Sequence, residues 1–381
     1  MKRVLHYVGK MNRGGMETFI MNLYRNIDRE KIDFDFAVHG DKAGDFEEEI
    51  LGIGGKFFYF PHMRKNPIAY RKAWRSFWKE NGSDYVAFHM HTNSLANVIA
   101  LEEAAKAGVP VRIIHSHSSM ANKGKLQWLN DFLHRHNQKR IPKLATDLFA
   151  CSDKAAEWLF GGNIVHGIKV VQINNGVDVE KFKFNVENRQ KIREKFGFGD
   201  TDKVIGHIGA FIPVKNHRFL VDVVEKAYMM DKSVRCLLVG NGVLLEEIKA
   251  YAEQKSLSDV IVFAGVCGNV NELLSAMDVF VMPSLYEGLP VSLVEVQANG
   301  LPAVVSDTIT TDVKMQENLH YLSINLPAET WAKEIEKTIA NYVHSDDYSC
   351  VRENGFDIID TVKLYENTIM NRGEQQDEQA Q

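Results

Sequence analysis

Residues 3–27 read RVLHYVGKMNRGGMETFIMNLYRNI. The first seven form a short β-branched and aromatic run, which predicts a strand. Residues 16–27 have the apolar spacing of an amphipathic helix. A strand that leads through a loop into a helix is the repeating unit of a parallel sheet covered by helices.

This unit recurs along the chain in two series, which are separated by a polar, charged passage at residues 184–200. We therefore expect two tandem, doubly wound α/β domains of the Rossmann type, with the carboxyl ends of both sheets facing a shared cleft. The expected domains are 1–182 and 183–355, followed by a helix at 356–372 that crosses back to the first domain and a disordered polar tail at 373–381. The further strands are expected within residues 34–40, 56–60, 85–91, 111–117, 147–152 and 169–176, and then within 204–210, 235–240, 260–265, 279–284 and 302–307.

The composition is that of an ordinary globular protein. The 381 residues are 45% hydrophobic and 25% charged, which excludes a chain that is disordered, collagen-like or coiled-coil as a whole. The sequence has no apolar run of about 18 residues and no signal-peptide pattern. Its four cysteines form no C-x-x-C pair. We expect a cytoplasmic protein with reduced cysteines.

Positive charge is concentrated in the first half of the chain. Residues 51–150 hold 15 Lys and Arg against 6 Asp and Glu, a surplus that attracts phosphate-rich surfaces. Within it, residues 64–79 read RKNPIAYRKAWRSFWK, with aromatics at Tyr70, Trp74, Phe77 and Trp78. Basic charge with aromatic side chains suits an anionic leaflet, so one hypothesis is peripheral contact with the inner face of the membrane. The alternative is that the aromatics pack on the sheet and only the charges face water.

Two loops carry the unusual residues. Gly14 and Gly15 precede the first helix. Two glycines at this position either let the backbone approach a diphosphate closely or simply form a tight turn from strand to helix. This loop is not G-x-G-x-x-G, which disfavours a nicotinamide or flavin dehydrogenase. The second segment, 284–295, reads SLYEGLPVSLVE and places Glu295 about 7 Å along a helix that starts near Pro290. With Glu287 in the loop, two carboxylates suit one elongated, hydroxyl-rich ligand; alternatively, Glu295 only complements the helix dipole.

The run EGLPVSLVE at 287–295 resembles the E-x7-E signature of the retaining nucleotide-sugar glycosyltransferases of family 4, which have the GT-B fold of two Rossmann-like domains. The resemblance covers nearly the whole chain and extends to the bacterial enzymes that build capsular polysaccharides and exopolysaccharides. Further segments that carry it are GGME at 14–17, FACSD at 149–153, WLFG at 158–161, NNGVD at 174–178, LVGNG at 238–242 and AVVSDT at 303–308.

The resemblance implies a hexosyltransferase-type enzyme that moves a sugar from an NDP-sugar to a lipid-linked or polysaccharide acceptor, with no nucleic-acid partner. It implies no cofactor and no metal, because cationic side chains and helix amides stabilise the leaving diphosphate. It assigns hydroxyls of the donor sugar to Glu287, the ribose hydroxyls to Glu295 and the diphosphate to Lys215. The remaining donor contacts fall on Gly14, Gly15, Arg218, Gly265, Val266, Val270, Gly288, Leu289, Pro290 and Val291.

Two H-x-H pairs, at residues 89–91 and 115–117, lie at the ends of expected strands. Alternation puts each pair on one face, so four imidazoles could converge on a metal ion, although no matching Cys or Asp ligand lies beside them. The family resemblance instead places one catalytic histidine in the cleft, with His117 as the first choice and His115 as the second. Hydrogen-bonded strand ends are the favoured explanation for His89 and His91.

One position departs from the family pattern. Ala210 stands where an arginine commonly follows the glycine after the first strand of the second domain. Losing one charge-assisted hydrogen bond weakens binding roughly ten- to a hundredfold, unless Arg218 or Arg13 compensates. A second hypothesis is therefore a catalytically weakened relative that acts as an NDP-sugar-binding or regulatory subunit. A third, an NDP-sugar epimerase on the same fold, is disfavoured by the E-x7-E pattern.

Overall fold

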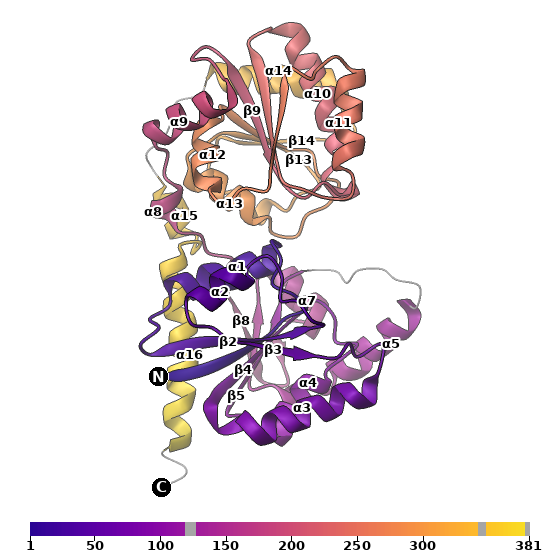
Figure 1. Cartoon of the computed structure of the whole chain (residues 1–381), viewed down its shortest axis with the longest axis vertical. Helices are drawn as coiled ribbons and strands as arrows, with labels where there is room; N and C mark the ends of the chain where they lie inside the picture. Colours follow the sequence, from indigo (N-terminus) through magenta and orange to yellow (C-terminus); the bar gives the residue numbers. More distant parts are fainter. Residues whose placement is uncertain (119–126, 342–347, 378–381) are drawn as a thin grey trace. The chain divides into compact units, whose positions relative to one another are not determined.

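The computed structural model describes residues 1–118, 127–341 and 348–377, with side chains described as far as residue 370. Its contacts divide the chain into two compact units: Met1–Gly176 with the chain from Ile358, and Val177–Asp357. Each unit is an α/β domain built on a mostly parallel sheet, so the expected fold class is confirmed (Figure 1).

The first unit is built on an eight-stranded sheet in the order β3-β2-β1-β4-β5-β6-β8-β7, in which only β7 and β8 pair antiparallel. Helices α3, α4, α6 and α7 bury their apolar residues on one face of this sheet, and α1, α2 and α16 on the other. The strands are β1 (Lys2–Tyr7), β2 (Ile32–His39), β3 (Phe57–Phe60), β4 (Tyr85–Thr92), β5 (Val111–Ser116), β6 (Asp147–Ala150), β7 (Ile164–Val165) and β8 (Ile168–Gln172). The helices are α1 (Gly15–Asn26), α2 (Glu47–Gly52), α3 (Pro67–Asn81), α4 (Ile99–Lys106), α5 (Gln127–Gln138), α6 (Ile141–Leu144), α7 (Asp153–Phe160) and α16 (Ile358–Asp377), with a 3-10 turn at Gly82–Asp84.

The second unit has a six-stranded, fully parallel sheet in the order β11-β10-β9-β12-β13-β14. Helices α10, α11 and α14 cover one face, and α8, α9, α12, α13 and α15 cover the other. The strands are β9 (Lys203–Ile208), β10 (Val234–Val239), β11 (Ile261–Gly265), β12 (Val279–Met282), β13 (Ala303–Ser306) and β14 (Leu319–Leu322). The helices are α8 (Val179–Phe182), α9 (Val186–Phe196), α10 (His217–Met230), α11 (Leu245–Gln254), α12 (Val270–Ala276), α13 (Val291–Ala298), α14 (Ala328–Ala340) and α15 (Ser349–Glu353), with 3-10 turns at Pro213–Lys215 and Thr311–Val313.

The chain enters and leaves the second unit at neighbouring positions, since Val177 N donates a hydrogen bond to Phe356 O over 2.9 Å. Helix α16 then packs against α1 in the first unit (Figure 1). It continues to Asp377, into the segment that we expected to be a disordered tail, and residues 378–381 lie outside the described part of the chain. Among the described residues, no helix combines the length and the apolar composition that a bilayer span requires.

Helix α3 corrects one expectation from the sequence. Its aromatic side chains Tyr70, Trp74, Phe77 and Trp78 are buried in the core of the first unit, and the Trp74 ring stacks on Phe60 with centroids 3.9 Å apart. Their helical spacing places them along one apolar stripe, and this stripe packs against the sheet. The hypothesis that these aromatics meet a membrane is therefore wrong, and the alternative, that they pack on the sheet, is confirmed. Of residues 64–79, the basic side chains and the exposed Ile68 remain for such a contact.

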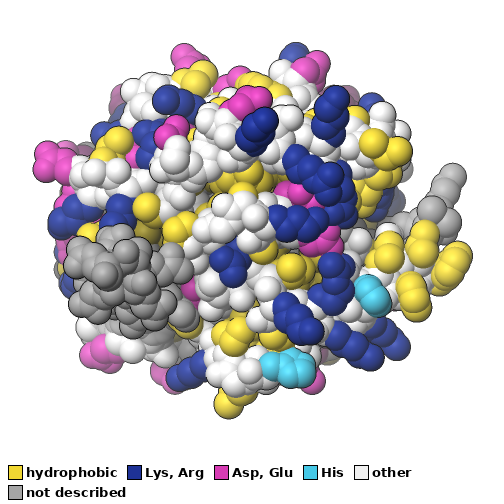
Figure 2. All heavy atoms as spheres, turned by 90° about the horizontal axis from the view of Figure 1, so that it is seen from below, with side chains coloured by type: hydrophobic (Ala, Val, Ile, Leu, Met, Phe, Trp, Pro, Cys, Tyr) yellow, Lys and Arg dark blue, Asp and Glu magenta, His cyan; other side chains and the backbone are white. Residues whose placement is uncertain are grey.

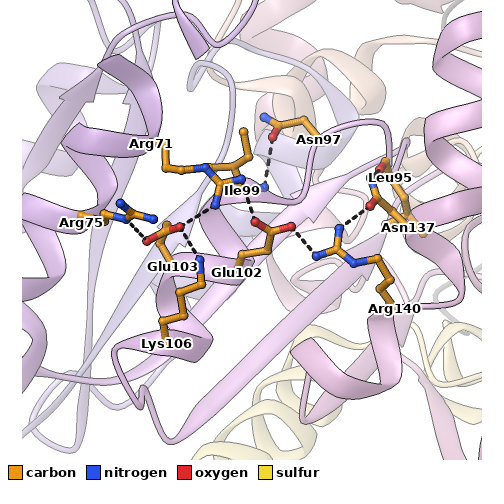
Figure 3. Close-up of polar contacts among 10 residues, drawn as sticks. All are labelled: Arg71, Arg75, Leu95, Asn97, Ile99, Glu102, Glu103, Lys106, Asn137 and Arg140. Atoms are coloured by element: carbon orange, nitrogen blue, oxygen red, sulfur yellow. Dashed lines mark hydrogen bonds and ion pairs between the residues drawn. The ribbon is translucent and has the colours of Figure 1, made fainter. Parts of the chain in front are cut away.

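A network of ion pairs joins α3 to α4 (Figure 3). Glu102 and Glu103 of α4 are largely buried, and each carboxylate is held by two or three cations at 2.6–3.0 Å. Burial alone raises the pKa of Glu103, but its cations outweigh burial and lower that pKa below its usual value. Part of the positive surplus of residues 51–150 is thus neutralised within the fold. The cations are Arg71 and Arg140 at Glu102, and Arg71, Arg75 and Lys106 at Glu103.

We expect Trp74→Ala to lower the free energy of unfolding by about 3–5 kcal/mol, because it empties a fully buried aromatic site. Lys72→Ala on the exposed face of α3 is the matched control and should change it by less than about 0.5 kcal/mol. Chemical denaturation of both variants measures the difference. An equally small effect of both substitutions would contradict the burial of the aromatic stripe.

Candidate active site

Four loops meet at the carboxyl edge of the second sheet. The strand order reverses between β9 and β12, which is the point where open α/β sheets bind ligands. Gly209 N donates to Val239 O over 2.9 Å, and Gly240 N donates to Gly265 O over 2.8 Å. Leu285 N donates to Val214 O over 2.8 Å. Backbone hydrogen bonds therefore join the loops after β9, β10, β11 and β12 into one continuous edge.

The loop after β10 needs its glycines because two backbones approach closely here. A side chain at Gly240, whose φ is +137°, would collide with the carbonyl oxygen of Gly209. A Cβ at Gly242 would lie 2.5 Å from Phe211 O. The LVGNG segment is thus explained by the packing of one loop on another.

Lys215 and Glu287 form an ion pair across this edge, with Nζ and Oε1 2.7 Å apart and both side chains largely buried. Lys215 ends the 3-10 turn before α10, and Glu287 lies in the loop between β12 and α13. A cation and a carboxylate held side by side offer one partner for phosphate oxygens and one for hydroxyl groups.

Glu295 lies inside α13, which begins at Val291 directly after Pro290, as predicted. Its side chain is buried, and in the described part of the chain it makes no hydrogen bond or ion pair. Burial raises the pKa of Glu295 from its ordinary value of 4.5 to about 7, with Lys181 acting weakly in the opposite direction. Near neutral pH this carboxyl is therefore divided between its protonated and ionised forms, and a hydroxyl-bearing ligand would supply the missing hydrogen bonds.

The other expected donor contacts of the second unit are distributed around the same edge. Gly265 ends β11 with φ +69°, Val266 follows with its side chain exposed, and Val270 begins α12. Gly288, Leu289 and Pro290 lead into Val291 at the start of α13. Arg218 differs, because its guanidinium stacks on the Tyr251 ring of α11, 3.9 Å from the centroid. Ala210 is exposed and contributes no charge.

Three of the expected site residues belong to the first unit. Gly14 caps the N-terminus of α1, with the Glu17 carboxyl against it, and Gly15 has open space where a side chain would begin. His117 follows β5 and is partly exposed, whereas His115 within β5 is fully buried.

His117 is one end of a hydrogen-bonded chain of aromatic groups. Its Nε2 lies 2.8 Å from His91 Nδ1, and His91 Nε2 lies 2.9 Å from His6 Nδ1. Tyr365 Oη of α16 lies 3.1 Å from His89 Nδ1 and 3.4 Å from His6 Nε2. Burial lowers the pKa of His6 and His117 to about 3, so these rings are uncharged at neutral pH. The sequence pattern indicated four of the five histidines but not His6 or Tyr365.

The second unit also holds polar groups that the sequence analysis missed. His207 Nε2, both ring nitrogens of His217 and Ser284 Oγ are buried without a partner among the described residues. His217 stacks on Phe211 with centroids 4.0 Å apart, next to the loop after β9. The signal was present in the segment PVKNH, where His217 follows Lys215 by two residues.

A cavity of about 1000 Å³ opens in the first unit between the carboxyl end of β4, the start of α3 and α5. Its wall combines apolar side chains with hydroxyl, amide, imidazole and cationic groups and the carboxylate of Asp131, a mixture that suits a sugar-bearing ligand. Lining residues include Arg64, Lys65, Thr92, Asn93, Asn130 and His134.

Comparison with known proteins places the chain in a family. Residues 13–181 match the family described as Glycosyltransferase Family 4, and residues 188–355 match Glycosyl transferases group 1. The chain is 40% identical over 343 residues to the putative glycosyltransferase EpsF of Bacillus subtilis (strain 168), covering 89% of this chain and 88% of that protein. It is 24% identical over 379 residues to the capsular polysaccharide biosynthesis glycosyltransferase CapH of Staphylococcus aureus, covering 98% and 99%.

A third relative names a donor and an acceptor. The UDP-Gal:alpha-D-GlcNAc-diphosphoundecaprenol alpha-1,3-galactosyltransferase of Escherichia coli is 29% identical over 236 residues, covering 58% of each chain. Among solved structures, Anabaena Alr3699/HepE in complex with UDP-glucose has a TM-score of 0.78 at 16% identity, covering 97% of this chain and all of that one. The similarity to the HepE structure shows that the two chains share a fold.

Fold and matches together define a glycosyltransferase of the GT-B fold. The chain belongs to the group 1 glycosyltransferases, with a family 4-like first domain, and is related to bacterial capsule and exopolysaccharide glycosyltransferases.

The raised pKa of Glu295 generates a prediction about stability. Between pH 4.5 and about 7 the folded chain keeps the Glu295 proton that the unfolded chain releases, so this group makes the free energy of unfolding fall as pH rises. Glu295→Gln removes that dependence. Relative to wild type, its free energy of unfolding should rise by about 2–3 kcal/mol between pH 5 and pH 8 without ligand.

Denaturant titrations at both pH values measure this change. Glu247→Gln, at an exposed glutamate of α11, is the control and should track wild type. Parallel pH profiles for Glu295→Gln and wild type would contradict a buried, protonated Glu295.

Proposed function

We propose that this chain is a retaining hexosyltransferase that moves a sugar from a UDP-sugar or related NDP-sugar to a lipid-linked or polysaccharide acceptor in cell-surface polysaccharide synthesis. The Lys215–Glu287 ion pair at the switch point of the second sheet is the observation that carries the proposal. The E. coli relative, whose name gives a UDP-sugar donor and a diphosphoundecaprenol-linked acceptor, and CapH support the choice of substrates.

In this proposal the second unit binds the donor. Lys215 neutralises the diphosphate, which releases Glu287 to accept hydrogen bonds from the donor sugar. Glu295 accepts from the ribose hydroxyls, which favours its ionised form. The edge near Gly265, Val266 and Val270 contacts the base. Lys215 and the amides at the start of α13 offset the charge that develops on the leaving diphosphate, and so the transfer is proposed to need no divalent metal.

The proposed reaction exchanges one bond for another at the anomeric carbon. The bond from this carbon to the diphosphate oxygen breaks while the acceptor hydroxyl oxygen forms a new bond on the same face, so the configuration is retained. The acceptor proton passes to the leaving phosphate oxygen. His117 has an uncharged ring at the surface of the first unit, and its proposed role is to contact the reacting sugar as a hydrogen-bonding group.

The cavity in the first unit is the proposed acceptor site. Arg64 and Lys65 on its wall suit the phosphate of a lipid-diphosphate-linked sugar, and Thr92, Asn93 and Asn130 suit its hydroxyls. Gly14 and Gly15 at the start of α1 are proposed to admit the donor phosphates near backbone amides.

Ala210 supports the alternative of a weakened relative that binds NDP-sugar without turning it over. The position is exposed and uncharged, and Arg218, the nearest substitute in sequence, is engaged with Tyr251. This alternative keeps nucleotide binding and loses turnover, which gives the two functions distinct outcomes in one experiment.

We expect Lys215→Ala to lower kcat/KM for donor consumption by about 10²–10³, because it removes the cation beside the leaving group. Glu287→Gln should lower it roughly ten- to a hundredfold. Lys226→Ala, at a partly exposed cation elsewhere on α10, is the control and should match wild type. The assay follows consumption of a panel of UDP-sugars with a lipid-diphosphate-linked sugar as acceptor, with and without a chelator.

Each outcome decides between the alternatives. Turnover in the presence of the chelator that collapses with Lys215→Ala supports the enzyme. No turnover by wild type or Ala210→Arg, with UDP still raising the melting temperature, supports the binding subunit. Absence of both turnover and UDP binding would contradict both functions, and an inverted product configuration would contradict retention.

The surface of the first unit supports a proposed membrane contact. Trp128 and Phe132 of α5 are 71% and 64% exposed and lie four residues apart on one helix face, and Ile68 at the start of α3 is 82% exposed. The cavity wall joins the start of α3 to α5, where Arg64 and Lys65 add positive charge. Figure 2 shows a face on which Lys and Arg side chains gather near exposed hydrophobic ones. This combination suits an anionic bilayer that presents a lipid-linked acceptor.

We expect the double variant Trp128→Ser/Phe132→Ser to lose at least about tenfold in binding to vesicles that contain anionic lipid, because two interfacial side chains no longer insert. Val243→Ser, at an exposed apolar residue of the second unit, is the control. Cosedimentation at low and high salt measures both. Failure of wild type to bind, or equal binding by the double variant, would exclude α5 as the contact.

A further inference from the structure

Three histidines of the first unit bring ring nitrogens together in a buried cluster. His91 ends within β4, His115 lies in β5, and His117 follows β5; the register pairs His91 with His115 on adjacent strands. One ring nitrogen of each lies within 4.8 Å of the others. The register thus places His115 beside His91 on one face of the sheet, and the His117 ring, just beyond β5, lies 3.9 Å from the His115 ring and 5.0 Å from the His91 ring between centroids.

The cluster leaves polar atoms without partners. His115 is fully buried, and neither of its ring nitrogens has a hydrogen-bond partner among the described residues. The same holds for His117 Nδ1 and His89 Nε2. A buried polar atom without a partner costs about 1–3 kcal/mol, so the unpartnered nitrogens of His115, which lies beside His91 and His117, point to a partner that the protein chain does not supply.

We propose that His91, His115 and His117 form a binding site for a late first-row divalent metal ion, with Zn²⁺ as the occupant. Three imidazoles and one open position make the ligand set that Zn²⁺ accepts in tetrahedral sites, and the absence of carboxylates from the triad disfavours Mg²⁺ and Ca²⁺. Zinc–nitrogen bonds of about 2.0–2.1 Å place ligand nitrogens roughly 3.4 Å apart. His91 Nδ1 and His117 Nε2, now 2.8 Å apart, would separate slightly to admit the ion.

His6, His89 and Tyr365 do not bind the ion in this proposal. Their hydrogen bonds instead orient the ligand His91. If Tyr365 donates to His89 Nδ1, its oxygen accepts from His6 Nε2, and His6 Nδ1 then accepts from His91 Nε2. This arrangement of protons leaves the lone pair of His91 Nδ1 directed at the proposed ion. A ligating histidine whose other nitrogen donates to a fixed acceptor is the usual pattern of metal sites.

The second possible triad, His6, His89 and His91, is a weaker choice for the ion. Most of its nitrogens are already engaged with one another, with His117 or with Tyr365, and only His89 Nε2 has no partner among the described residues. All three rings are also buried, whereas His117 is partly exposed and gives the outer triad a route to solvent.

The ion belongs to the resting protein in this proposal and takes no part in the proposed transfer. A metal on His117 occupies the ring nitrogen that faces His91, and so it competes with movement of this ring toward a substrate. That consequence rests on the proposed function, whereas binding of the ion does not.

Titration of the tag-free, full-length chain with Zn²⁺ tests the site by calorimetry, without any substrate. We expect one high-affinity ion per chain, and Co²⁺ in its place should give the visible absorption of a tetrahedral nitrogen site. His115→Asn should weaken binding at least about tenfold. His136→Gln, which removes an exposed histidine of α5, is the matched control and should bind like wild type.

Tyr365→Phe keeps all three ligands and removes only the outer hydroxyl, so it should weaken Zn²⁺ binding roughly tenfold while its circular dichroism stays that of wild type. No saturable binding to wild type, or equal binding by His115→Asn and wild type, would overturn the proposal. Loss of binding in His136→Gln would instead assign the ion to the surface. The titration contains no sugar donor or acceptor, so its result does not depend on whether the protein is an active transferase.

Discussion

Close backbone approach at the carboxyl edge of the second sheet is the constraint on which the candidate active site depends. The loops after β9 and β10 touch through Gly209 and Gly240, where no side chain fits. Their contact fixes where the 3-10 turn can deliver Lys215, and the hydrogen bond from Leu285 to Val214 brings the next loop alongside it. The 2.7 Å ion pair with Glu287 is thus a result of main-chain packing.

The chain buries charge-bearing groups in three different ways. Glu102 and Glu103 are surrounded by cations that join α3 to α4, and these cations hold the pKa of Glu103 below its usual value. The five histidines have no such partners and lose their charge to burial. Glu295 is intermediate, because its pKa lies close to neutral pH. Only the first arrangement is complete within the fold, and the other two leave polar atoms that a ligand would satisfy.

The sequence predicted the features that depend on local patterns. Alternating strands and helices indicated two parallel α/β units, and Pro290 marked the start of α13. The pattern could not show strand order, which brings His6 of β1 beside His89 of β4. Tyr365 is more than 350 residues from His6 in the chain, and nothing local connects them. An amphipathic helix that faces a sheet has the same sequence pattern as one that faces a membrane. Only the packing in the folded structure shows that the aromatic side chains of α3 face the sheet.

The excursion of the chain between Gly176 and Ile358 has a consequence for biosynthesis. Helix α16 supplies Ile358, Val362, Tyr365 and Ile369 to the core of the first unit, yet the ribosome makes it after the whole of the second unit. The second unit is contiguous in sequence and can complete its core as soon as residue 357 has emerged. Until α16 has been synthesised, one face of the first unit's sheet remains partly uncovered. The order in which the two units mature during translation is therefore the reverse of the order in which they begin, and the histidine cluster is closed last.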